Sequence, residues 1–128
     1  MTLIEEIAQY LHNQSVGQLA TNLFFSYLPD TDTGTFSITV LDTGGMRPDP
    51  DLPTKEPTFQ IFLSATTYEI GKAKLDAIRT ALHQLKNIQL IPGGTYFYFI
   101  LANAEGGHLG RNENGRDEFS INFHARTR

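Results

Sequence analysis

Three stretches of the chain alternate apolar and polar side chains with a period of two residues. Successive side chains of a β-strand point to opposite faces of the sheet, so this period predicts strands with one apolar face. That apolar face must be covered by another layer of structure, which restricts the chain to a layered fold built on a sheet. The alternating stretches are Phe36–Leu41, Thr58–Ser64 and Asp117–Ala125.

Two further stretches, Leu23–Tyr27 and Thr95–Ala102, are rich in aromatic and β-branched residues and are also predicted to be strands. The turn residues of Pro29–Gly34 predict that the first strand forms a hairpin with the strand after it. Asn114 and Gly115 precede the last strand, and this pair is typical of a type I′ hairpin turn. The sequence thus predicts a mixed, mainly antiparallel sheet of five strands.

Two amphipathic segments predict two helices. Thr2 and Glu5 have the spacing of a capping box, so the first helix is expected at Leu3–Asn13, and the second at Thr67–Leu85. Gly71 lies on the apolar stripe of the second helix, where glycine costs about 1 kcal/mol in helix propensity; we expect it to allow close approach to a neighbour. Residues 1–128 are therefore predicted to form one α+β domain, in the order α-β-β-β-α-β-β, with both helices on one face of the sheet.

Composition excludes several classes of protein. The chain has no cysteine, which rules out disulfides and thiolate chemistry, and no apolar run long enough for a membrane helix. The amino terminus lacks a signal-peptide pattern, so we expect the protein to act in the compartment where it is made. A net charge of -4 argues against a DNA-coating role, although it leaves room for a local basic patch.

No residue pattern predicts catalysis, a metal or a cofactor. The four histidines lack metal-ligand spacing and are expected at the surface or at sheet edges. Asp30–Gly34 begins like a calcium loop, but its glycine comes one residue early and no glutamate closes it. Asp117 and Glu118 are adjacent on a predicted strand, so their carboxylates face opposite sides and cannot act together.

The strand within Thr95–Ala102 differs from its companions because its run of aromatic and aliphatic residues is apolar on both faces. Two helices cover one face of a small sheet, so part of the other face is expected to meet a second copy of the protein. The alternative is a central strand buried within its own domain. The interface candidates on this strand are Phe97, Phe99 and Leu101.

The connection 42–57 is too rich in glycine, proline and acids for a helix or strand, and it holds four of the six prolines. Structureless loops longer than about 12–15 residues are usually functional or disordered. A flexible coil of this length spans on the order of 20 Å, enough to reach a neighbouring subunit, where we expect Gly44–Pro57 to become ordered. The alternative is a merely mobile surface loop. The interface candidates in it are Gly44, Gly45, Met46, Arg47, Leu52 and Lys55.

Arg111 and Arg116 flank the hairpin turn before the last strand. Guanidinium groups can bind the carboxylates of a partner or the phosphates of DNA. The alternative is that both are solvated turn charges.

Four segments together give the chain a familiar pattern, which covers nearly its whole length and is most specific in the last of them. They are Phe24–Asp30, Asp42–Gly45, Ala73–Leu85 and Leu109–Phe123. With them the chain resembles the bacteriophage minor capsid protein family, whose members look like tail terminators.

The resemblance implies a non-enzymatic virion subunit without a cofactor. It implies a ring, typically hexameric, that caps the tail tube protein, docks to the head-side connector protein and lets DNA pass. It also implies assembly in the host cytoplasm and a place in the tail or neck of the virion. Such a ring needs two complementary surfaces on each subunit, which the loop 42–57 and the exposed sheet face could supply.

Two other functions are alternatives to this one. The same fold could serve as a head-tail connector or stopper subunit on the portal side. A small-molecule-binding or enzymatic α+β domain is the third possibility, and it predicts a pocket with convergent polar groups, which the scattered His, Asp and Glu residues do not supply.

Overall fold

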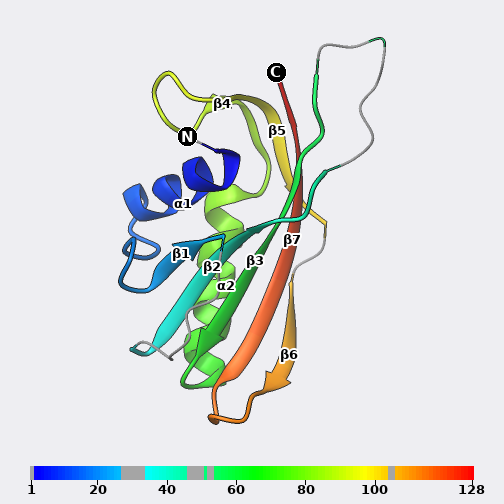
Figure 1. The fold of residues 1–128 in the computed structure, drawn as a ribbon. Coiled ribbons are helices and arrows are strands. Elements are labelled where there is room, and N and C mark those ends of the chain that lie inside the picture. Colours follow the sequence, from blue (N-terminus) through cyan, green and yellow to red (C-terminus); the bar gives the residue numbers. More distant parts are fainter. Residues whose placement is uncertain (1, 27–33, 46–50, 52–53, 104–105) are drawn as a thin grey trace.

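The structure of the protein is a computed structural model that describes residues 2–26, 34–45, 51, 54–103 and 106–128. Two helices pack on one face of a mostly antiparallel sheet (Figure 1). The elements are α1 (Leu3–Asn13), β1 (Leu23–Phe25), β2 (Phe36–Asp42), β3 (Thr58–Ala65), α2 (Tyr68–Leu82), β4 (Leu85–Gln89), β5 (Tyr96–Ala102), β6 (Gly107–Arg111) and β7 (Asp117–Thr127).

The predicted α+β class is correct, but within the described residues the sheet has seven strands instead of five, because the sequence does not predict β4 and β6. The segment of β4 begins at Leu85, where the second helix was expected to end; the helix ends at Leu82, and Gln84 then takes a positive φ of 64° that turns the chain. β4 is largely exposed, and β6 is exposed and contains two glycines. Neither segment has the apolar alternation from which strands are predicted. Each becomes a strand because it pairs with a neighbouring strand.

The first two strands are parallel and do not form the predicted hairpin, since Leu23 pairs with Ile38 and Phe25 with Val40. β1 has only three residues and spans about 10 Å. The connection that follows it is therefore long enough to return along the strand before β2 starts. Residues 27–33 of that connection lie outside the described residues. They include all of the calcium-like segment Asp30–Gly34 apart from Gly34.

The sheet order is β1-β2-β3-β7-β5-β4, with β6 paired to β7. β7 is the central strand, and β3 pairs with it along Asp117–His124. On its other side β7 is shared: β6 pairs with its first half and β5 with its second half. The strands β6 and β5 thus pair one after the other with the same edge of β7.

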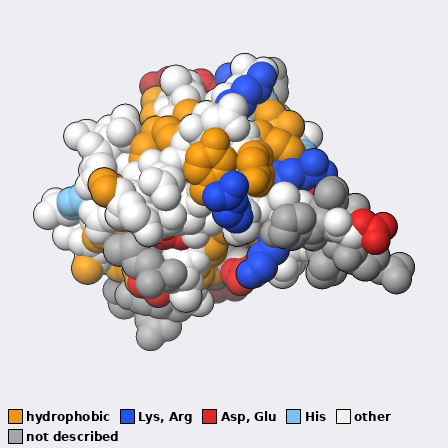
Figure 2. Space-filling view, turned by 90° about the horizontal axis from the view of Figure 1, so that it is seen from above, with side chains coloured by type: hydrophobic (Ala, Val, Ile, Leu, Met, Phe, Trp, Pro, Cys, Tyr) orange, Lys and Arg blue, Asp and Glu red, His pale blue; other side chains and the backbone are white. Residues whose placement is uncertain are grey.

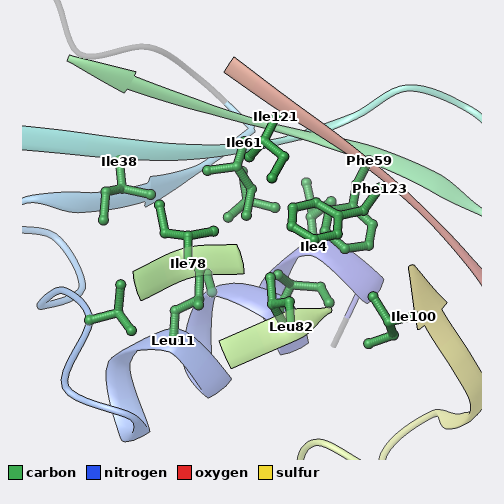
Figure 3. Packing of buried hydrophobic residues seen from close by; sticks show 14 of the residues in the cluster. Ile4, Leu11, Ile38, Phe59, Ile61, Ile78, Leu82, Ile100, Ile121 and Phe123 are labelled. Carbon is green, nitrogen blue, oxygen red and sulfur yellow. The ribbon is translucent and has the colours of Figure 1, made fainter. Parts of the chain in front are cut away.

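The core lies between the sheet and the two helices, which are on the same side of the strands (Figure 3). Phe59 and Phe123 are fully buried and stack across β3 and β7, with ring centroids 5.1 Å apart. The predicted role of Gly71 is confirmed, because a Cβ built there would lie 2.0 Å from Cε1 of Phe119. The absent side chain lets α2 rest directly on the Phe119 ring.

Candidate assembly surfaces

The aromatic strand β5 divides its side chains between the core and the outer face of the sheet. A bulge separates Phe97 from Phe99. Phe97 is fully buried in the core, whereas Phe99 and Leu101 are half-buried on the face opposite the helices. Phe97 is therefore buried within its own domain and offers no surface to a partner. Phe99 and Leu101 are partly exposed on the outer face of the sheet.

The connection between β2 and β3 is anchored at both ends. Lys55 and Thr127 exchange two backbone hydrogen bonds of 2.9 Å, and the amide of Thr43 donates to the carbonyl of Thr58 at 3.2 Å. Gly45 has a φ of 107°, and a Cβ there would lie 2.9 Å from the carbonyl oxygen of Glu56. We call residues 43–57 the arm.

Three of the predicted interface residues, Gly44, Gly45 and Lys55, lie at the base of the arm and are exposed. Met46, Arg47 and Leu52 lie outside the described residues. The idea that the arm becomes ordered on assembly is thus limited to its middle, since both ends are already bound to the sheet.

Beside the base of the arm, the outer face of the sheet combines aromatic rings with cations. Lys86 of β4 stands opposite Phe99, which stands opposite Arg126 of β7. Directly paired residues of neighbouring strands point to the same face, so these three side chains form a row. Arg126 lies 5.9 Å from the Phe99 ring and also forms an ion pair with Glu56 of the arm.

A second row lies next to this one. Arg128 is 5.9 Å from the Tyr96 ring, and the rings of Tyr96 and Tyr98 meet edge to face at 5.2 Å. From above, this end of the molecule presents apolar side chains with Lys and Arg side chains beside them (Figure 2). We call the two rows the cation-aromatic face, which comprises Lys86, Tyr96, Tyr98, Phe99, Arg126 and Arg128.

The hairpin predicted before the last strand is present, between β6 and β7. Its turn is not of type I′, because that type needs positive φ at both central residues and only Gly115, at 76°, has one. The amide of Gly115 donates to the carbonyl of Asn112 at 3.0 Å, and that of Asn112 donates to the carbonyl of Arg116 at 2.8 Å.

The two arginines of this hairpin lie in different environments. Arg116 is buried, and its Nε donates to Oγ of Ser64 and its Nη1 to the carbonyl of Gly34, both at 2.9 Å. It is neither a solvated turn charge nor a free surface cation. It connects the hairpin to a residue just before β2 and to the end of β3. The Arg111 side chain is 64% exposed and remains accessible to a partner.

Asp117 at the start of β7 holds the same hairpin from its other side. Its buried carboxylate faces Nε2 of His108 at 2.9 Å and accepts from Nη2 of Arg111 at 3.3 Å. Burial raises the pKa of Asp117, but the hydrogen bonds and charges of His108 and Arg111 outweigh it and lower the pKa below its ordinary value of 3.8.

Sequence reasoning did not single out the exposed apolar pair at this end of the molecule. Tyr68 and Leu109 are 49% and 59% exposed, the only large apolar side chains classed as exposed in the described part of the chain. Tyr68 packs edge-on against His108, with ring centroids 5.1 Å apart. Helical spacing from Gly71 and Leu75 predicts a buried Tyr68, but this residue is in the first turn of α2 and its side chain is exposed.

Glu6 of α1 is another residue that sequence reasoning missed: the spacing of the apolar residues of this helix predicts that its side chain faces outward, but the side chain is buried. It is 2% exposed, and its carboxylate accepts hydrogen bonds from the amide and the hydroxyl of Thr95 at 2.7 and 2.6 Å. It lines a hollow of about 470 Å³ beside residues 91–95. These bonds attach α1 to the β4-β5 turn. Within the described ranges, no group of three His, Cys, Asp or Glu residues could hold a metal ion.

The fold is α+β, and the cation-aromatic face and the base of the arm lie on its surface. A chain from the virion of a native gene transfer agent particle has a similar fold, with a TM-score of 0.66 and 17% identity over 98% of this chain and 93% of that one. No curated protein matches the sequence.

The sequence profile of a family described as "Bacteriophage tail terminator protein" matches residues 10–127. The chain therefore belongs to the bacteriophage tail terminator family. It is a structural protein of the virion, located at the tail. None of the described helices is long and apolar enough to cross a membrane.

Proposed function

We propose that copies of this chain form a ring, a hexamer, that ends the tail tube and joins it to the head-side connector. DNA passes through the ring on its way into the tail, and the ring assembles in the host cytoplasm. The observation that carries the proposal is the partly exposed apolar surface of Phe99 and Leu101 on the sheet face that the helices leave uncovered.

A second surface is needed, because head-to-tail contacts close into a ring only when each subunit presents two different, complementary surfaces. The arm is suited to be part of one of them. Its two ends leave the sheet together, at the end of the molecule where the chain terminates (Figure 1). The pairing of Lys55 with Thr127 fixes the direction in which the arm leaves the domain.

The test of ring formation is a mass measurement in solution across a range of concentrations, with and without purified tail tubes. We expect a population with six times the subunit mass to appear as the concentration rises or when tubes are added. A chain that stays monomeric under all of these conditions would contradict the proposal.

The place in the particle can be tested by imaging particles that lack this protein. Loss of a terminator leaves overlong tails or tails that are not joined to heads. Heads that leak DNA while the tails keep their normal length would instead assign the chain to the portal side, as a connector or stopper.

A further inference from the structure

The cation-aromatic face and the rest of the chain carry net charges of opposite sign. The cation-aromatic face holds three of the ten Lys and Arg residues, and one of the fourteen Asp and Glu residues, Glu56, is bound to it. The face therefore carries a charge of +2, which leaves -6 on the rest of the chain for a total of -4. Outside this face, a second copy of the chain therefore carries a net negative charge.

The composition of the face is that of a protein-protein contact. Tyrosine, phenylalanine and arginine are enriched at the centres of interfaces, where their large side chains contribute much of the binding free energy. The rings of Tyr96 and Phe99 are held in place by packing against Tyr98 and His124, and the Tyr96 hydroxyl donates to Oδ1 of Asn87 at 3.2 Å. Little side-chain entropy remains to be lost when a partner binds.

We propose that the cation-aromatic face of one subunit docks on a second copy of this chain at a different surface, outside that same face, where the net charge is negative, so that neighbours contact each other head to tail. This inference rests on the proposed ring. The same charges disfavour the alternative in which two copies join through the same face, because a face of +2 would then meet another of +2. Electrostatics thus disfavours a two-fold dimer at this face and favours the contact that can continue around a ring.

A nucleic acid is the other polyanion that such a face could attract, but the details favour a protein. Arg126 is already paired with Glu56, whose carboxylate would repel phosphates. Only Lys86 and Arg128 remain without an acidic partner on the face itself, and tracking along DNA draws on many phosphate contacts. Two cations beside an aromatic patch match a compact protein surface with negative charge better than they match the backbone of DNA.

The test uses the full chain with Lys86→Glu and Arg128→Glu combined, both of which are exposed positions. We expect the concentration needed for assembly to rise on the order of tenfold or more, with the unfolding midpoint unchanged, and we expect added salt to weaken assembly of the unaltered protein. Lys72→Glu on the exposed side of α2 is the control for charge, and it should leave assembly within about twofold.

Phe99→Ala tests the aromatic part of the face independently of charge, and Leu109→Ala, an exposed apolar residue elsewhere, is its control. We expect weaker assembly for the first and not for the second. A Phe99→Ala protein that assembles like the unaltered one would count against the face, provided circular dichroism finds it folded.

The outcomes separate the two proposals. An unaltered chain that never assembles overturns the ring itself. An unaltered chain that assembles, together with a double charge variant that assembles equally well, overturns only the docking face. Binding of a short DNA duplex that is lost in the double variant, while its ring forms normally, would assign the face to nucleic acid and overturn the inference.

Discussion

At the scale of single residues, Gly71 decides how closely α2 approaches the sheet. Replacing it with alanine gains about 1 kcal/mol in helix propensity, yet the new Cβ would lie 2.0 Å from a ring that is fully buried and cannot retreat. Overpacking costs typically about 1–3 kcal/mol and more where backbone must move, so the overlap outweighs the gain. Because the overlap is severe, we place its cost at the upper end of this range; after the gain in propensity is subtracted, we expect Gly71→Ala to lose about 1–2 kcal/mol in urea unfolding. Gly107→Ala, which meets open space, should change stability by less than about 1 kcal/mol, and equal losses would contradict this account.

Arg116 is the other residue whose role depends on burial. Arg116→Ala leaves the Gly34 carbonyl and the Ser64 hydroxyl without their donor, so we expect a loss of about 2–4 kcal/mol in the free energy of unfolding. Arg111→Ala, at the exposed end of the same turn, should cost less than about 1 kcal/mol. If the two variants unfold at the same denaturant concentration, Arg116 does not tie the hairpin to β2 and β3.

At the scale of elements, the β6-β7 hairpin depends on the ionisation of Asp117. The pKa of this carboxyl is lower in the folded protein than in the unfolded chain. Its contribution to stability is therefore complete above the unfolded pKa of about 4 and is lost as the pH falls through the lower folded pKa. We expect unfolding experiments to find a loss of stability below about pH 4 that Asp117→Asn removes in part. Glu113→Gln in the exposed turn is the control, and an unchanged pH profile in Asp117→Asn would exclude this role.

At the scale of the whole molecule, the arm is expected to join subunits without supporting the fold. Replacing residues 46–53 with a short Gly-Ser linker keeps the backbone pairing of Lys55 with Thr127 and the Arg126–Glu56 ion pair. We expect an unchanged thermal midpoint and weaker assembly, measured by unfolding and by light scattering. A shortened chain that assembles like the full one would remove the arm from the interface.

Hydrogen exchange of the single subunit and of the ring gives a second test of the arm. Lys55 already donates its amide to Thr127, so its protection should be similar in both states. Residues 46–53 should gain protection on assembly if they become ordered there. Equal protection of these residues in both states would contradict ordering on assembly.

Much of this protein follows from local pattern. The period of two in Thr58–Ser64 and Asp117–Ala125 determined the central strands, the helical period determined most of both helical faces, with Glu6 and Tyr68 as exceptions, and Gly71 on the apolar stripe indicated a close contact. These features depend on side chains a few residues apart, so the sequence alone carries them.

Other features depended on contacts between distant residues, which no local pattern encodes. β4 and β6 become strands because β5 and β7 offer them partners, and β1 pairs parallel with β2 although the turn residues between them predict a hairpin. Tertiary packing likewise buried Phe97, enclosed Arg116 and brought Lys86, Phe99 and Arg126 from three strands into one row. The sequence determined which segments have an apolar face, whereas strand pairing in three dimensions decided which side chains remain available to a second subunit.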